Sequence, residues 1–179
     1  LLDTTALSES IGFDVTKPYF ALTYHPVTLA GKRPSAAISE LIAALEDFPE
    51  HSVVVTAPNA DTQGRDAFAA LRTYAEAAPA RVLFTVSLGQ VRYLSLMKHA
   101  AAVIGNSSSG LIEAPALATP TVNMGPRQRG RERAASVIDC DETRSGIRAA
   151  ITKAVSPAFL ASIKNTAHPF GDGRASPRI

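Results

Sequence analysis

The chain has 179 residues, which is the length of one globular domain with room for a buried core. Its net charge of +2 is too small for bulk attraction to nucleic acids or membrane surfaces, and we expect neither as a partner. The single cysteine, Cys140, excludes an internal disulfide, and no Cys/His spacing typical of a zinc site is present. No apolar run approaches the roughly 20 residues that cross a bilayer. We expect a cytoplasmic protein that uses neither a metal nor a cofactor.

Short apolar runs alternate with amphipathic segments along the chain. In chain order the sequence predicts a strand at 19–24, a helix at 35–45, a strand at 52–56, a helix at 65–77, a strand at 81–85, a helix at 91–100, strands at 101–105, 121–123 and 136–139, and helices at 142–154 and 157–164. The tail from 167 to 179 is rich in Gly and Pro, and we expect it to be irregular.

The predicted strands are continuous apolar runs instead of alternating ones. Such runs are typical of strands that are buried on both faces, as in a parallel sheet covered by helices. Together with the alternation of strands and helices, they predict an α/β fold with a doubly wound parallel sheet, Rossmann-like in architecture.

Distinctive polar clusters follow the predicted strands where each strand ends. In chain order these are Tyr24-His25-Pro26, Ala57-Pro58-Asn59, Ser87-Leu88-Gly89, 106–110 and Pro126-Arg127-Gln128-Arg129. Ligands of doubly wound sheets bind at the carboxyl ends of the strands. The shared placement therefore predicts a ligand site at this edge of the sheet.

The run Gly105-Asn106-Ser107-Ser108-Ser109-Gly110 joins a strand to an apolar segment that begins at Leu111. A helix that starts here would present unpaired N–H groups, and small side chains would let an anion approach them, which is a phosphate-binding geometry. The alternative is a set of N-cap serines that only starts the helix. Pro115 is expected to kink this segment or to shift its start.

Three further side chains have both a functional and a structural interpretation. Glu113 cannot be explained by a capping box, because Gly110 stands where Ser or Thr is needed; a carboxylate there could accept hydrogen bonds from a ribose diol or simply complement a helix dipole. His25 could contact phosphate or exchange protons, although a lone histidine is more often structural. Asn59 could contact a ligand or form a turn.

Four arginines, Arg127, Arg129, Arg131 and Arg133, follow the strand at 121–123. One guanidinium on a pyrophosphate fits this place, and we expect the others to be solvated or paired. Common nucleotide and hydrolase motifs are absent, since no G-x-G-x-x-G follows the first strand and neither a P-loop nor a G-x-S-x-G elbow occurs.

Several longer segments together resemble the carboxyl-terminal half of hydrolysing UDP-N-acetylglucosamine 2-epimerases, in the branch used for sialic-acid and related nonulosonate synthesis. They are Thr23-Tyr24-His25-Pro26-Val27-Thr28, Pro58-Asn59-Ala60-Asp61, the stretch from Val103 to Pro115, the stretch from Thr121 to Arg131, and the ending from Phe170 to Ile179. The resemblance covers nearly the whole chain in the right order.

The resemblance implies the carboxyl-terminal half of a glycosyltransferase-B-like fold, with residues 1–179 forming the UDP-binding domain and the amino-terminal domain absent from this chain. It also implies site roles. His25 is expected near the diphosphate and the reacting sugar, as the catalytic candidate. The nucleotide contacts are expected from Asn59, Ser87 and Leu88, the pyrophosphate contacts from Ser107 and Ser108, the ribose contact from Glu113, and a further phosphate contact from Arg127.

The implied reaction eliminates UDP from UDP-N-acetylglucosamine, and water then adds to release N-acetylmannosamine. The catalytic carboxylates are expected in the amino-terminal domain, so this chain should be inactive alone. The full-length protein is expected to be a homodimer. It starts at Leu1 without an initiator Met or a signal peptide, as expected of a fragment. Alternatives are a UDP-sugar glycosyltransferase of the same fold, an epimerase of a UDP-diacetamido sugar, and a non-catalytic sugar-nucleotide binding module.

Overall fold

The computed structural model describes residues 1–27, 34–58, 64–164, 169–171 and 176. The strands are β1 (Tyr19–Thr23), β2 (Ser52–Thr56), β3 (Val82–Thr85), β4 (Ala102–Gly105), β5 (Thr121–Met124) and β6 (Val137–Cys140). The helices are α1 (Thr4–Ile11), α2 (Pro34–Leu45), α3 (Gly64–Ala77), α4 (Gly89–His99), the 3₁₀ turn η1 (Ser108–Gly110), α5 (Glu113–Ala116), α6 (Arg144–Ala154) and α7 (Pro157–Ile163). Every strand and helix predicted above by its residue range is present, with small shifts at the ends.

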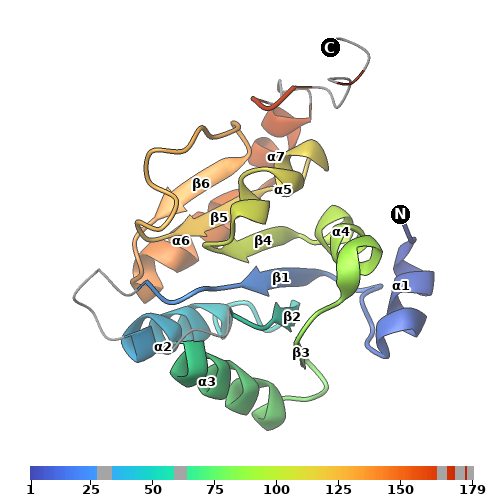
Figure 1. Ribbon diagram of the computed structural model, residues 1–179, viewed down its shortest axis with the longest axis vertical. Helices are drawn as coiled ribbons and strands as arrows, with labels where there is room; N and C mark the ends of the chain where they lie inside the picture. The colour runs from blue at the N-terminus through green and yellow to red at the C-terminus, as the bar shows by residue number, and fades with distance from the viewer. Residues whose placement is uncertain (28–33, 59–63, 165–168, 172–175, 177–179) are drawn as a thin grey trace.

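All six strands are parallel and lie in the order β3-β2-β1-β4-β5-β6. Figure 1 shows the strands side by side, with their carboxyl ends on the same edge of the sheet. The strand order reverses between β1 and β4, so the chain leaves these neighbours toward opposite sides. This topological switch point is where doubly wound sheets open a crevice for ligands.

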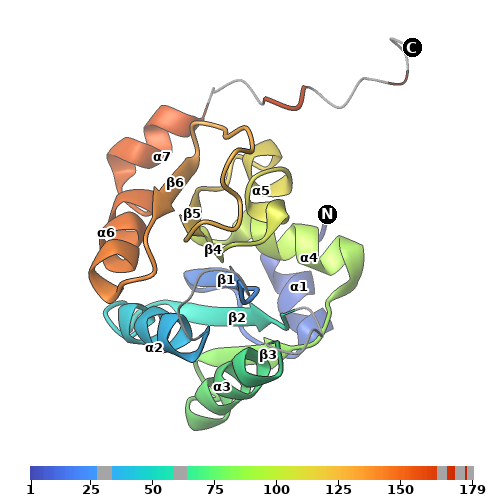
Figure 2. The ribbon, with the colours of Figure 1, turned by 60° about the vertical axis from the view of Figure 1, so that its left-hand side comes forward.

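Helices cover both faces of the sheet, as the continuous apolar strands predict (Figure 2). Phe20 and Leu22 of β1 point into a core formed with α2, α3 and α6, whereas Tyr19 and Ala21 point into a second core formed with α1, α4 and α5. All five residues of β1 are buried. Burial on both faces explains why this strand does not alternate between apolar and polar residues.

Helix α1 is the one regular helix that the sequence reasoning did not predict. It has clear ends: the side chain of Asp3 accepts a hydrogen bond from the Ala6 N–H at 2.8 Å, and Gly12 ends it in the left-handed conformation with φ of +66°. The helix has only three apolar residues, Ala6, Leu7 and Ile11, and of these only Leu7 is buried. Among the described helices, none combines the length and the apolar character that a membrane span requires.

The segment after β4 differs from the single helix expected to begin at the serine run. It forms the 3₁₀ turn η1, and after two residues the four-residue helix α5. Pro115 explains the break, because it has no N–H for the hydrogen bond that would continue a helix from η1. In α5 it occupies the first turn, where the missing donor costs nothing.

Candidate nucleotide site at the switch point

The serine run begins directly after β4 at the switch point. Ser107 caps η1, and its Oγ accepts a hydrogen bond from the Ser109 N–H at 3.4 Å and lies 2.8 Å from the Ser109 Oγ. Ser108 makes no side-chain hydrogen bond to any described residue. Because η1 and α5 are short, their dipoles are weak, and anion binding here would depend on local N–H and hydroxyl donors.

Five hydroxyl groups form a chain beneath the crevice. Thr56 at the end of β2 lies 2.5 Å from Thr23 at the end of β1, and Thr23 lies 3.2 Å from the Tyr93 hydroxyl. Tyr93 lies 2.8 Å from Ser109, which joins the chain to Ser107. These contacts connect the carboxyl ends of β1 and β2 and the turn after β4 to α4, so the positions of the five hydroxyl groups depend on one another.

A pocket of about 390 Å³ opens above this hydroxyl chain, and we call it the hydroxyl-lined pocket. Its lining consists of Thr23, Thr56, Ala57, Val86, Ser87, Leu88, Gly89, Gln90, Tyr93, Ser107 and Ser109. None of these side chains carries a full charge, and the volume lies in the range of pockets that bind small molecules. The sequence reasoning did not single out Tyr93 or Thr56, because a lone tyrosine or threonine carries no sequence signal.

The predicted uracil contacts, Ser87 and Leu88, both line this pocket. Ser87 is exposed and its Oγ accepts a hydrogen bond from the Gly89 N–H at 3.3 Å, which shapes the start of α4. Leu88 is buried and packs in the core beside α4. Asn59, predicted as a nucleotide contact, lies outside the described residues.

Glu113 is the first residue of α5 and is half-buried. Its Oε2 atom is shielded from solvent and has no hydrogen-bond partner among the described residues. A buried carboxylate oxygen without a donor is costly, and a ligand hydroxyl would satisfy it. Glu113 is not part of the lining of the hydroxyl-lined pocket itself.

The predicted residues His25 and Arg127 are brought together by Asn106. The Asn106 Oδ1 accepts from the His25 N–H and its Nδ2 donates to the His25 carbonyl, both at 2.7 Å. Its backbone carbonyl accepts from Arg127 Nη1 at 3.0 Å and from Gln128 Nε2 at 2.7 Å. The loops that leave β1, β4 and β5 therefore meet at one buried residue, which the sequence reasoning quoted within the serine run but did not assign to the site.

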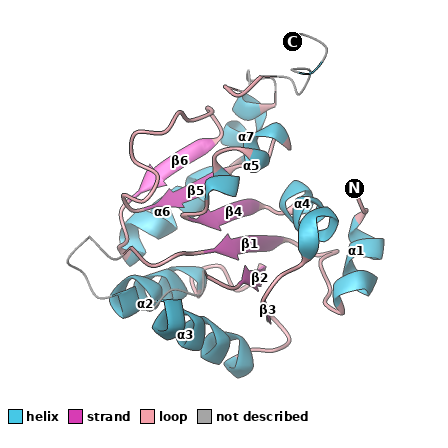
Figure 3. Ribbon diagram, viewed as in Figure 1, coloured by secondary structure: helices cyan, strands magenta, loops and turns pink. Residues whose placement is uncertain are grey.

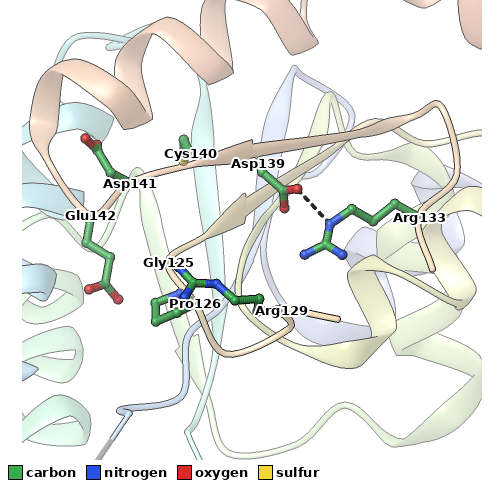
Figure 4. A pocket seen from close by; sticks show the side chains of 8 residues that line it. All are labelled: Gly125, Pro126, Arg129, Arg133, Asp139, Cys140, Asp141 and Glu142. Atoms are coloured by element: carbon green, nitrogen blue, oxygen red, sulfur yellow. Dashed lines mark ion pairs between the residues drawn. The ribbon is translucent and has the colours of Figure 1, made fainter. Parts of the chain in front are cut away.

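A second and larger hollow, of about 520 Å³, lies over the ends of β5 and β6, and Figure 4 shows the side chains that line it. We call it the charged hollow, and it is lined by Gly125, Pro126, Arg129, Arg133, Asp139, Cys140, Asp141 and Glu142. Of the described residues predicted to bind a ligand, none lines it. Figure 3 shows the long loop that crosses from β5 to β6 at its border.

Two of the five charged residues of this hollow form an ion pair with each other. Arg133 Nε lies 2.7 Å from Asp139 Oδ2, and Arg133 also donates to the carbonyls of Arg131 and Gln128. The other Asp139 oxygen accepts from Asn123 Nδ2 at 2.6 Å. Arg133 is thus paired within the protein, as expected for most of the four arginines.

Two titrating groups at this side of the sheet are kept protonated. Burial raises the pKa of the Cys140 thiol to about 12, and the carboxylates of Asp141, Asp139 and Glu142 add to the shift. Burial also raises the pKa of the Tyr24 hydroxyl, which donates to Glu142 Oε1 at 2.8 Å. Neither group is suited to act as a base at neutral pH.

The fold and the crevice define a doubly wound, Rossmann-like α/β domain with its open site at the switch point of the sheet. The chain belongs to the UDP-N-acetylglucosamine 2-epimerase family, whose model matches residues 3–179.

Two relatives illustrate this membership, and one solved structure shows the fold. A GDP/UDP-N,N'-diacetylbacillosamine 2-epimerase (hydrolyzing) of Campylobacter jejuni is 36% identical over 140 residues, covering 78% of this chain and 36% of that protein. The polysialic acid biosynthesis protein P7 of Escherichia coli is 34% identical over 155 residues, covering 86% of this chain and 39% of that protein. The chain thus spans less than half the length of these relatives.

The solved structure is a UDP-GlcNAc 2-epimerase of Neisseria meningitidis bound to UDP-GlcNAc. It superimposes with a TM-score of 0.71 at 15% identity, over 97% of this chain and 46% of that one. At this identity the likeness shows the fold, and the fold is that of one half of a glycosyltransferase-B-like enzyme.

Proposed function

We propose that this chain is the UDP-binding half of a hydrolysing UDP-N-acetylglucosamine 2-epimerase. The observation that supports it most is the uncharged, hydroxyl-lined pocket at the switch point, which ends at the serine run. A uracil and a ribose offer carbonyl, N–H and hydroxyl groups, and such a pocket can match these without charge. The diphosphate would then extend from the pocket toward Ser108 and Arg127.

The proposed reaction begins with loss of UDP. The bond between C1 of the sugar and the diphosphate oxygen breaks, a base takes the C2 proton, and a glycal-type intermediate remains. Water then adds across the double bond, with hydroxyl at C1 and a proton at C2, and N-acetylmannosamine is released. Negative charge builds on the departing diphosphate, so donors fixed near its oxygens lower the barrier.

This chain would supply those donors. In the proposal Ser107, Ser108 and Arg127 bind the diphosphate, and His25 lies between it and the reacting sugar. Glu113 accepts hydrogen bonds from the ribose diol, which gives its unpartnered Oε2 a donor. In the same proposal Ser87, Leu88 and Asn59 contact the nucleotide.

The base for the C2 proton is proposed to come from a second domain. No carboxylate lines the hydroxyl-lined pocket in the part of the chain that the structure describes. The 179-residue chain would therefore bind UDP weakly and release none from UDP-N-acetylglucosamine, whereas the complete enzyme would be a cytoplasmic homodimer with the site between its two domains. Detection of UDP release by this chain alone would contradict that division.

A UDP-diacetamido sugar is the second candidate substrate. A relative at 36% identity is named as an epimerase of N,N'-diacetylbacillosamine, and the pocket described above addresses the nucleotide and not the sugar. A product assay on the complete enzyme with each substrate separates the two. The same assay would expose a glycosyltransferase, which gives a glycoside and no free amino sugar.

The ribose contact can be tested by titration calorimetry with UDP and 2′-deoxy-UDP. We expect Glu113→Ala to lower the affinity for UDP by about tenfold, which is the loss typical of a hydrogen bond to a charged group. The affinity for 2′-deoxy-UDP should fall by less than about threefold. Glu132→Ala, which removes an exposed carboxylate, is the matched control and should change neither affinity. Equal losses for both nucleotides in Glu113→Ala would contradict the role of Glu113.

A further inference from the structure

The side chain of Asn106 is fully buried between the ends of β1 and β4, although it is polar and lies at the edge of the sheet. Its Oδ1 accepts from the His25 N–H and its Nδ2 donates to the His25 carbonyl, each at 2.7 Å. The amide thus replaces the strand partner that β1 loses where the sheet ends. Both backbone groups of His25 are held by one side chain.

The backbone of Asn106 joins two more segments to this point. Its N–H donates to the Thr23 carbonyl at 3.2 Å, and its carbonyl accepts from Arg127 and from the buried side chain of Gln128. The next residue is Ser107, which caps the serine turn. Asn106 therefore fixes the β1, β4 and β5 loops relative to one another.

Asn is the shortest side chain that supplies both contacts, since Gln carries the same amide on a stem one methylene longer in a fully buried site. Asp offers no donor for the His25 carbonyl and would bury a charge beside it, and Leu and Ala both remove the two hydrogen bonds to the His25 backbone. Gly105 brings the chain close enough for this contact: its φ is +128°, and a Cβ there would lie 1.9 Å from the Thr23 carbonyl oxygen. The close approach of β4 to β1 therefore brings the Asn106 side chain to the His25 backbone.

We propose that Asn106 is the positioning residue of the nucleotide site, holding His25 at a fixed place relative to Ser107 and Arg127. The inference rests on the proposed function, since it assigns these three residues to one diphosphate. Asn106 itself does not touch the ligand. Its side chain would act through the backbone of His25, and its loss would let the β1 loop move away from the phosphate-binding serines.

Amide hydrogen exchange of the 179-residue chain, followed residue by residue by NMR, tests this directly. In Asn106→Ala we expect the His25 amide to exchange at least about tenfold faster while the Ala21 amide within β1 is unchanged, because only a local contact is lost. UDP affinity by calorimetry should fall about tenfold. If the role of Asn106 were purely structural, Asn106→Ala would accelerate amide exchange at Ala21 and at His25 alike.

Asn123→Ala is the matched control, since Asn123 is also a buried asparagine of this sheet and its Nδ2 bonds Asp139 at 2.6 Å. It should leave the His25 amide and UDP binding unchanged. If Asn106→Ala does not fold, the unaltered chain still decides: the Asn106 side-chain NH₂ and the His25 amide should both be protected from exchange. Rapid exchange of either, an unchanged His25 amide in Asn106→Ala, or an equal effect of Asn123→Ala would overturn the proposal.

The binding and exchange measurements test the proposed function and the positioning role of Asn106 separately. If the unaltered chain does not bind UDP, the proposed function is wrong, while the exchange data still show whether Asn106 holds His25. If UDP binds and Asn106→Ala binds it equally well with a mobile His25 amide, the positioning role is wrong and the proposed function stands.

Discussion

The two hollows at the carboxyl edge of the sheet are built in opposite ways. The hydroxyl-lined pocket has no charged lining residue, and its hydroxyls are linked to one another. The charged hollow contains two arginines and three acids, and the contacts of Arg133 and Asp139 are with each other and with the neighbouring loop. The difference teaches that a cluster of charges is not by itself evidence of a ligand site, because charges paired within the protein, such as those of Arg133 and Asp139, have less to offer a ligand.

The backbone beneath the two hollows should differ most in its tolerance of change. Gly105 ends β4 under the serine run, and a Cβ there would lie 1.9 Å from the Thr23 carbonyl oxygen. Gly130 lies in the β5–β6 loop with φ of +84° and nothing within 4 Å of an added Cβ. We expect Gly105→Ala to lower the free energy of unfolding by at least about 3 kcal/mol.

Gly130→Ala should lower the free energy of unfolding by only about 1–2 kcal/mol, which is the cost of a left-handed residue without a clash. Urea denaturation of both variants provides the comparison. Similar losses for the two would mean that the close approach of β4 to β1 at the switch point is not as tight as described.

The chemistry of Cys140 distinguishes the charged hollow. With a pKa of about 12, a fraction of only about 10⁻⁴ of the thiol is ionised at pH 8. The higher nucleophilicity of a more basic thiolate offsets part of this, and alkylation by iodoacetamide should be at least about fiftyfold slower than that of free cysteine. The rate should rise about tenfold per pH unit between pH 8 and 10. A rate equal to that of free cysteine would contradict the burial of the Cys140 thiol and the effect of the carboxylates around it.

Blocking each pocket in turn tests which one binds the nucleotide. Ser107→Trp places a large side chain in the hydroxyl-lined pocket. It should lower the affinity for UDP by about thirtyfold, a loss of about 2 kcal/mol of binding free energy. Arg129→Trp, at the exposed rim of the charged hollow, should change the affinity by less than about threefold. Thermal unfolding of both variants would confirm that they remain folded. The reverse order of the two losses would move the site to the charged hollow.

The sheet and its helices could be predicted from the sequence because their signals are local. The five buried residues of β1 and the valines of β2 are continuous apolar runs, and such runs indicate strands buried on both faces. Helix α1 was missed because it buries only Leu7, even though Asp3 and Gly12 mark its ends. The helix expected after the serines was broken by Pro115, whose effect depends on where the helix starts.

The site was only partly predictable, because its contacts join distant parts of the chain. The serine run and the arginine loop were found from their composition and their place after strands. Asn106 pairs with His25, 81 residues away, and Tyr93 reaches Ser109 from another element. Neither pairing leaves a trace in the local sequence. The strand order that creates the switch point also depends on contacts that no single segment encodes.

A crystal structure of this chain grown with a saturating concentration of UDP would test the central claim most directly. We expect the uracil and ribose in the hydroxyl-lined pocket, with the diphosphate against Ser107 and Arg127 and a ribose hydroxyl on Glu113. A nucleotide bound in the charged hollow, or one that leaves the serine run untouched, would contradict the account.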